Sequence, residues 1–205
     1  MCRWPRNPSN GVLIIGRSAE KLRKVAQEIK EDGGLVRFES CDVRDEDIVG
    51  DVLSRLAGSQ PIDGLVNCAG GQFPALLSEM SATGFEAVVK NNLVSTFIVS
   101  KACYTQCMRD TGGAIVNIAS ISGQRASTLR VAYGTSKAGL MHLTKQMAVE
   151  FAGQGIRVNC VAPGPVVTEL MQKVVHNKEK SEELMRRLPI GYIAGQGPGG
   201  FFRGW

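Results

Sequence analysis

The chain has 205 residues, of which 43% are hydrophobic, which is enough for one well-buried domain and short for two. The formal net charge is only +5, and acidic and basic residues are interspersed, so no basic stripe for nucleic acid is indicated. No apolar run approaches the roughly 18 residues that span a bilayer, and no signal-peptide core follows the N-terminus. We therefore expect a cytoplasmic protein without nucleic-acid or membrane partners, with mitochondria and peroxisomes left open as locations.

The six cysteines are scattered along the chain and form no C-x-x-C pair. Cys103 and Cys107 lie four positions apart, but no histidine is near them in the sequence, so core packing is expected rather than a metal site. We expect reduced thiols and no bound metal.

The N-terminal part begins with an irregular lead-in over residues 1–10, which contains two prolines and no periodicity. The aliphatic run 12–15 then suits a buried parallel strand. Ser18 can cap a following helix that ends at Gly33-Gly34. The apolar positions of that helix repeat at helical spacing and are Leu22, Val25, Ala26 and Ile29.

The strand–helix unit then repeats along the chain. Further strands are predicted over 35–39, 64–67, 114–118 and 157–161, and further helices over 45–57, 81–108 and 131–151. In the helix 45–57, we expect Ile48, Val52 and Leu56 to face inward. This alternation predicts an α/β fold with a doubly wound parallel sheet and helices on both faces. We expect one domain over residues 1–190 and an irregular, glycine-rich tail over 191–205.

Three polar residues that could act together in proton transfer follow the strand 114–118: Ser120, Tyr133 and Lys137. Tyr133 and Lys137 lie four apart in a predicted helix and share one face. A neighbouring cation lowers the pKa of a phenol from about 10, so Tyr133 can exchange a proton near neutral pH. Ser120 can hydrogen-bond the oxygen that gains or loses this proton. Taken alone, the Tyr133–Lys137 pair is more typical of a tyrosine packed on a lysine stem at a helix surface than of a catalytic pair.

The spacing of Ser120, Tyr133 and Lys137, after the run Gly-Ala-Ile-Val-Asn-Ile-Ala-Ser, resembles the classical type of the short-chain dehydrogenase/reductase family. The resemblance covers residues 12–190. It implies a Rossmann-like, three-layer αβα fold and hydride transfer with a nicotinamide cofactor. It also implies that Tyr133 is the general acid and base, that Ser120 orients the substrate oxygen, and that Lys137 lowers the tyrosine pKa and holds the nicotinamide ribose. Asn92, in the run Lys-Asn-Asn-Leu, would support the proton relay by helping to hold a water.

The same resemblance implies which residues bind the cofactor. Arg17 and Ser18 stand where an acid would accept the ribose hydroxyls of NAD, and they can contact a 2′-phosphate, so NADP is expected rather than NAD. Asn67 can instead serve mainly to tie strands together. The other implied cofactor-binding residues are Asp42 at the adenine with Val43, Asn67, Ala69 and Gly70 in an Asn-Cys-Ala-Gly segment, Tyr133, Lys137, and Pro163, Gly164, Val166 and Thr168 around a Pro-Gly turn.

The glycine-rich turn that opens members of this family has no counterpart in the sequence. The strand 12–15 matches the family's second strand, and in the strand order 3-2-1-4-5-6 the missing first strand lies centrally. We therefore expect a gap between two halves of the sheet and weak cofactor binding, because the pyrophosphate lacks its helix N-terminus. We also expect that the sequence is a truncated or mispredicted reading frame, or a splice form, of an ordinary reductase.

The resemblance implies NADP(H)-dependent interconversion of a carbonyl and an alcohol, with a ketone or a 3-oxoacyl thioester as substrate. The run Gly70–Phe73 is also similar to branches that reduce enoyl thioesters. We expect 123–130 and 166–178 to line the substrate pocket, and a homodimer or homotetramer to form through the helices 81–108 and 131–151. The competing interpretation is a catalytically impaired fragment that acts only as a binding or oligomerisation partner.

Overall fold

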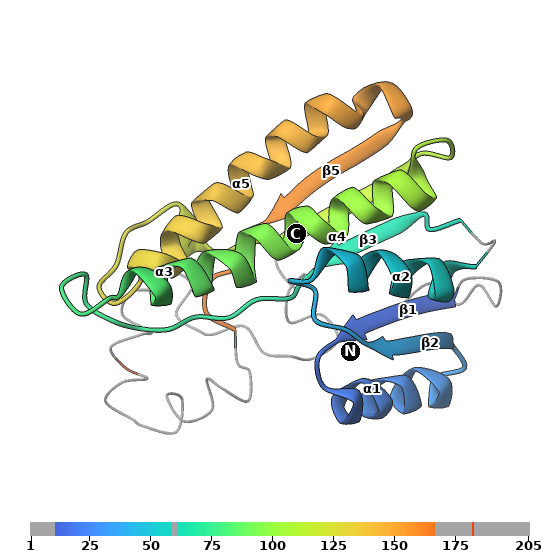
Figure 1. Ribbon diagram of the computed structural model, residues 1–205, viewed down its shortest axis with the longest axis horizontal. Helices are drawn as coiled ribbons and strands as arrows, with labels where there is room; N and C mark the ends of the chain where they lie inside the picture. Colours follow the sequence, from blue (N-terminus) through green and yellow to red (C-terminus); the bar gives the residue numbers. More distant parts are fainter. Residues whose placement is uncertain (1–10, 59–60, 167–181, 183–205) are drawn as a thin grey trace. The chain divides into compact units, whose positions relative to one another are not determined.

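The computed structural model describes residues 11–58, 61–166 and 182 (Figure 1). Of these, the residues up to 162 belong to one compact unit, and residues 163–166 and 182 belong to a second unit. The lead-in 1–10 and the tail 191–205 lie outside the described residues. Five strands occur where the sequence predicted them: β1 (Gly11–Gly16), β2 (Leu35–Ser40), β3 (Gly64–Asn67), β4 (Gly113–Ile118) and β5 (Ile156–Val161).

The helices also follow the predicted alternation. They are α1 (Ala19–Glu31), α2 (Glu46–Ala57), α3 (Ala82–Val89), α4 (Ser95–Cys103) and α5 (Val131–Phe151), with short 3-10 turns η3 (Ile121–Gly123) and η4 (Ala152–Gln154). The single helix expected over 81–108 is observed as one run of helical segments. The π-helical turn η1 (Lys90–Val94) joins α3 to α4, and α4 continues into a second π-helical turn, η2 (Tyr104–Met108). Such turns often occur at functional sites, and η1 contains Asn92. No helix in the described part of the chain has the length and apolarity that a membrane crossing needs.

All strand pairs are parallel, as in a doubly wound fold, but the strands form two sheets. β1 pairs with β2, whereas β3, β4 and β5 form a separate three-stranded sheet in that order. Between residues 11 and 166, β1 therefore has only β2 as a strand partner and β3 has only β4. The gap that the sequence predicted between the halves of the sheet is confirmed for this part of the chain.

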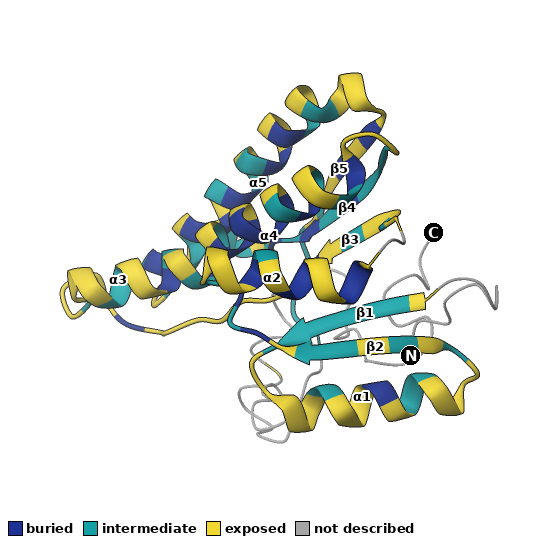
Figure 2. Ribbon diagram, turned by 45° about the vertical axis from the view of Figure 1, so that its right-hand side comes forward, coloured by how far each residue is buried: buried dark blue, intermediate teal, exposed yellow. Residues whose placement is uncertain are grey.

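The three-stranded sheet buries one face more deeply than the other (Figure 2). Alternate residues of β4 and β5, among them Ile115, Asn117 and Val158, are buried and lie on the side of the helices. Val66, on the opposite face of β3, is 51% exposed. A parallel sheet is normally covered on both faces, whereas this sheet is covered unequally.

The hydrophobic core lies where α2 and α4 meet β4, and it also receives side chains from β1. α2 buries the i, i+3, i+4, i+7 face that comprises Val49, Val52, Leu53 and Leu56. The expectation that Ile48 points inward is wrong: Ile48 is 44% exposed, because the buried face starts one residue later, about 100° around the helix. Val25 of α1 is likewise exposed, and Ala26 is the buried residue there.

The unequal burial of the two faces of the sheet can be tested with large-to-small substitutions, one on each face. Ile115→Ala removes methyl groups from a fully buried site in β4, and we expect it to lower the free energy of unfolding by about 2–5 kcal/mol in urea titrations. Val66→Ala in the neighbouring strand should cost less than about 1 kcal/mol, because half of that side chain already contacts solvent. Equal losses for the two variants would contradict the one-sided burial.

Candidate active site

The carboxyl end of β4 carries Ser120 into the site. Ser120 has an extended backbone, and its Oγ accepts a hydrogen bond of 3.2 Å from the backbone N–H of Ser122, so the serine caps the turn η3. The turn packs directly on α5, and Gly123 lies at this contact. A Cβ on Gly123 would lie 2.8 Å from the backbone carbon of Lys137 and the backbone nitrogen of Ala138. Glycine at this position therefore sets how closely the serine turn approaches the helix that carries Tyr133.

Lys137 extends from α5 to the end of β4, beside Tyr133. Its Nζ donates a hydrogen bond of 2.7 Å to the carbonyl oxygen of Ile118 and lies 5.8 Å from the centroid of the Tyr133 ring. The residue is only 5% exposed. Burial lowers the pKa of the Lys137 ammonium, and the nearby thiols of Cys68 and Cys160 oppose this shift. The structure thus brings together the two residues that the helical spacing placed on one face, in a desolvated setting.

Asn92 joins this group through the loop that follows β3. Its Oδ1 accepts a hydrogen bond of 3.1 Å from the N–H of Gly71, and its Nδ2 donates to the carbonyls of Gly71 at 2.7 Å and Val88 at 2.8 Å. The backbone carbonyl of Asn92 accepts from Thr96 Oγ1 at 3.1 Å. The fully buried amide therefore holds the loop in place. That Asn92 supports a proton relay through water stays a prediction.

The loop after β3 fits the close approach of a nicotinamide cofactor. Residues 68–70 are exposed, and Ala69 and Gly70 present little or no side chain. A Cβ on Gly70 would lie 2.5 Å from Asn92 Oδ1 and 3.6 Å from Lys137 Nζ, so glycine is required there. The backbone of Gly70 consequently lies beside the lysine that would hold the nicotinamide ribose.

A buried chain of side-chain hydrogen bonds lies directly behind these residues. Asn67 Nδ2 donates to Ser100 Oγ and to Asn117 Oδ1, both at 2.9 Å, and Asn117 Nδ2 donates to Thr144 Oγ1 at 2.9 Å. Asn67 therefore ties β3 to β4 and α4, which was one of the two roles considered for it, and its contact with a cofactor stays a prediction. Sequence reasoning missed the other three members, since each one alone looks like an ordinary polar residue in a core element.

The residues predicted to meet the adenosine half of a cofactor lie at the ends of β1 and β2. Ser18 Oγ accepts from the N–H of Lys21 at 3.3 Å and caps α1, as the sequence predicted, and Arg17 is exposed beside it. The Asp42 carboxylate forms an ion pair with Arg44 at 2.5 Å. Hydrogen bonds from the Arg44 side chain are the main cause that lowers the pKa of Asp42 to about 2. Val43 is buried in the core.

For several residues that were predicted to bind the cofactor or line the substrate pocket, the structure shows no position relative to Tyr133 and Lys137. Thr168 lies outside the described residues, as do most of 166–178. Pro163, Gly164 and Val166 follow β5 and belong to the second unit, so their contacts with a cofactor stay predictions. Cys103 is buried in the core as expected, and the described residues contain no cluster of three or more metal-ligating side chains.

Arg130 is a neighbour of Tyr133 that sequence reasoning did not identify as part of the site. It is the residue before α5, and its guanidinium carbon lies 6.0 Å from the centroid of the Tyr133 ring, within cation–π range. Leu129, just before it, has a left-handed backbone with φ of 63°, which is unusual for a branched residue. The only sequence signal was a basic residue three positions before the tyrosine.

Comparison with known proteins identifies the class of protein. The family model described as short chain dehydrogenase matches residues 8–179. The 3-oxoacyl-[acyl-carrier-protein] reductase of Chlamydia trachomatis is 34% identical over 184 residues, which cover 89% of this chain and 73% of that protein. The peroxisomal 2,4-dienoyl-CoA reductase of Danio rerio is 35% identical over 156 residues, which cover 75% of this chain and 52% of that protein. The chain belongs to the short-chain dehydrogenase/reductase family.

Solved structures agree with this identification. A gluconate 5-dehydrogenase from Burkholderia cenocepacia, determined in complex with NADP and tartrate, superposes with a TM-score of 0.83 at 29% identity. The match covers 89% of this chain and 72% of that one. The Rossmann-like α/β fold and the family resemblance inferred from the sequence are thus confirmed, and the chain is a member of an oxidoreductase family that interconverts carbonyls and alcohols.

The close contact at Gly123 can be tested by adding a single methyl group. Gly123→Ala must push η3 away from α5, and we expect it to lower the free energy of unfolding by about 1–3 kcal/mol. Gly153→Ala is the matched control, because nothing lies within 4 Å of the added Cβ in η4. Urea unfolding of both variants measures the difference. A neutral Gly123→Ala would contradict the packing of the serine turn on the helix.

Proposed function

We propose that this protein interconverts a carbonyl and an alcohol by using NADP(H), with Tyr133 as general acid and base. The observation that carries the proposal is the desolvated Lys137 ammonium beside the Tyr133 ring, at the end of the strand that leads to Ser120. This arrangement puts a phenol hydroxyl and a cation in one partly desolvated place, where the cation can stabilise negative charge that develops on the phenol oxygen in the transition state.

Each catalytic residue then has a defined task. The bound nicotinamide supplies the hydride in the reducing direction. Tyr133 donates its proton to the carbonyl oxygen, and the Ser120 hydroxyl orients that oxygen. Lys137 stabilises the tyrosinate that remains and holds the nicotinamide ribose. Asn92 fixes the loop at Gly71. A nicotinamide cofactor would be held along this loop.

NADP is proposed rather than NAD because of Arg17. This exposed arginine follows β1, and its charge contributes to lowering the pKa of Asp42, so it lies near that carboxylate. A guanidinium at this place suits a 2′-phosphate and offers nothing to accept the ribose hydroxyls of NAD. Ser18 Oγ, the atom that would contact the 2′-phosphate, already caps α1. We therefore attribute most of the preference for NADP over NAD to Arg17.

We propose a 3-oxoacyl thioester as the substrate. Two of the relatives reported above are, by name, reductases of acyl thioesters, one on acyl-carrier protein and one on coenzyme A. Ser120 and Tyr133 suit reduction of a 3-oxo group directly. Reduction of an enoyl thioester is the alternative, which the run Gly70–Phe73 and the dienoyl-CoA reductase favour.

The proposal includes a homodimer or homotetramer formed through α4 and α5. Phe97 of α4 is 46% exposed and Val149 of α5 is 77% exposed, so both helices present large apolar side chains to solvent. Burial of such side chains between copies of the chain stabilises association.

Tyr133→Phe tests the proposed proton transfer. Removing the hydroxyl should reduce NADPH-dependent reduction of acetoacetyl-CoA by about 10²–10⁴-fold, because general acid catalysis contributes that much, while NADPH binding persists. Absorbance at the nicotinamide band measures the rate, and nicotinamide fluorescence measures the binding.

Tyr104→Phe is the matched control, since the ring of Tyr104 stacks on Phe151 at 4.2 Å, away from Lys137, and the substitution keeps that ring. A Tyr133→Phe variant as active as the Tyr104→Phe control would refute the assigned role.

A further inference from the structure

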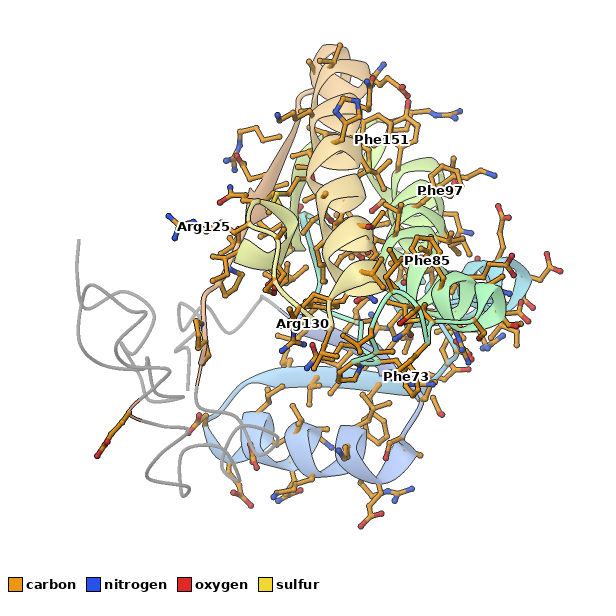
Figure 3. All side chains as sticks on the ribbon, turned by 90° about the vertical axis from the view of Figure 1, so that its left-hand side faces the viewer. Phe73, Phe85, Phe97, Arg125, Arg130 and Phe151 are labelled. Carbon is orange, nitrogen blue, oxygen red and sulfur yellow. The ribbon has the colours of Figure 1, made fainter. Side chains whose placement is uncertain are left out.

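Arg130 carries a guanidinium that the stability of its own helix does not explain. The residue lies at the N-cap position of α5 (Figure 3), and its side chain makes no capping hydrogen bond. The helix dipole disfavours a cation at a helix N-terminus, and arginine is not among the usual capping residues. The first turn of α5 contains no acidic residue that would offset this charge. A function other than helix capping is therefore indicated for this side chain.

The Arg130 guanidinium has donors that the described residues do not use. The residue is partly buried, and its carbonyl accepts a hydrogen bond of 2.6 Å from the N–H of Gly134. Among the described residues, however, its side chain makes no hydrogen bond or ion pair. Lys137, which also lies beside the Tyr133 ring, instead donates to the carbonyl of Ile118. Because partly buried donors normally find acceptors, the guanidinium is suited to an oxygen of a ligand.

Arg130 lies where a substrate at Tyr133 can reach it. Its guanidinium carbon is 6.0 Å from the centroid of the Tyr133 ring, at the limit of cation–π range, so the ring alone is a weak partner. Arg130 also lines a groove of about 300 Å³ between the segment after β4 and the first turns of α5, which gives a ligand room beside it. Leu129, the preceding residue, has a φ of 63° although its side chain is 44% exposed, and such backbones cluster at binding sites.

These features favour a substrate with a second acceptor oxygen near the carbonyl that is reduced. In a 3-oxo thioester a single CH₂ group separates the two carbonyls, so the thioester oxygen lies close to Tyr133 when the 3-oxo oxygen meets the phenol. A guanidinium N–H bonds such an oxygen at about 2.9 Å, and its charge strengthens the bond. No acidic residue occurs in the sequence between Asp110 and Glu150, so no carboxylate of this segment competes for Arg130.

We propose that Arg130 donates a hydrogen bond to the thioester carbonyl oxygen of the 3-oxo substrate and so selects 3-oxo thioesters over isolated ketones. This inference rests on the proposed function, because it assigns the group that holds the second oxygen of that substrate. Ser120 and Tyr133 bind the oxygen that is reduced, and Arg130 binds the one that is not. The substrate is then fixed by both carbonyls, and an isolated ketone lacks one of the two contacts.

Two substrates that differ by one oxygen test this contact. They are the N-acetylcysteamine thioester of acetoacetate and the thioether S-(3-oxobutyl)-N-acetylcysteamine, in which CH₂ replaces the thioester carbonyl. In Arg130→Met, kcat/KM should fall about tenfold for the thioester and less than about twofold for the thioether. Arg109→Met is the matched control, because it removes a guanidinium that lies 5.3 Å from another tyrosine ring, that of Tyr104, and it should change neither value. Equal losses for the two compounds in Arg130→Met would overturn the inference.

Two further measurements separate this role from other roles of Arg130. Urea unfolding of Arg130→Met should show an unchanged or raised midpoint, because the substitution removes a cation from a helix N-terminus. A midpoint lower than that of Arg109→Met would assign Arg130 to the fold and overturn the inference. Acetoacetate, the free acid, is the third substrate. A loss for acetoacetate without a loss for the thioester would overturn the inference in favour of a carboxylate site.

Binding decides the site even without turnover. In calorimetric titrations of the 205-residue chain with NADP⁺ present, the thioester should bind at least about fivefold more tightly than the thioether, and Arg130→Met should remove this difference. Equal binding of the two compounds to the unmodified chain, or no measurable binding of the thioester, would overturn the inference. If the unmodified chain shows the difference in binding but reduces neither compound, the proposed function fails and the Arg130 site stands.

Discussion

The site depends on a buried chain of hydrogen bonds that runs from Ser100 through Asn67 and Asn117 to Thr144. Each of these side chains is 8% exposed or less, and all their buried polar atoms have partners. Breaking one link would leave a buried polar group unsatisfied at a cost of about 1–3 kcal/mol, so the chain fixes β3 and β4 against α4 and α5. The reactive residues lie immediately beyond it: Lys137 is seven residues before Thr144 on the same face of α5, and its ammonium meets Ile118, the residue after Asn117.

Three glycines complete this geometry by allowing close approach. Gly123 brings the serine turn against the backbone of α5, and Gly70 lets the loop after β3 pass Asn92 and Lys137. Gly71 provides the two backbone groups that the Asn92 amide binds. Asn92 lies in the π-turn η1, and its amide binds both the helix, at Val88, and the loop, at Gly71. The candidate site is therefore built from backbone contacts as much as from its polar side chains.

Much of the fold follows from the sequence because its apolar residues are clearly grouped, at helical spacing in the helices and in short aliphatic runs in the strands. Strands were predicted at their observed places, and the order of motifs predicted the break between β1 and β3. The error at Ile48 arises because this residue borders the apolar face of α2, and the packing of the helix buries the face that begins one residue later. The π-turns and the Ser100–Thr144 chain were not predictable, because an i→i+5 turn has no sequence signature and a hydrogen-bond chain links residues up to 50 positions apart. Arg130 was missed because an arginine three positions before the tyrosine forms no recognisable motif, and its contact with the Tyr133 ring is seen only in the folded chain.

We propose that the described residues form a nicotinamide-binding site around Lys137. Titration of the 205-residue chain with NADPH and with NADH, followed by nicotinamide fluorescence, tests this claim most directly. We expect saturable binding that is tighter for NADPH than for NADH. Arg17→Ala should make the affinities for the two cofactors equal, and Lys137→Met should weaken the binding of both. Absence of saturation at millimolar NADPH, or binding that is unaffected by Lys137→Met, would contradict it.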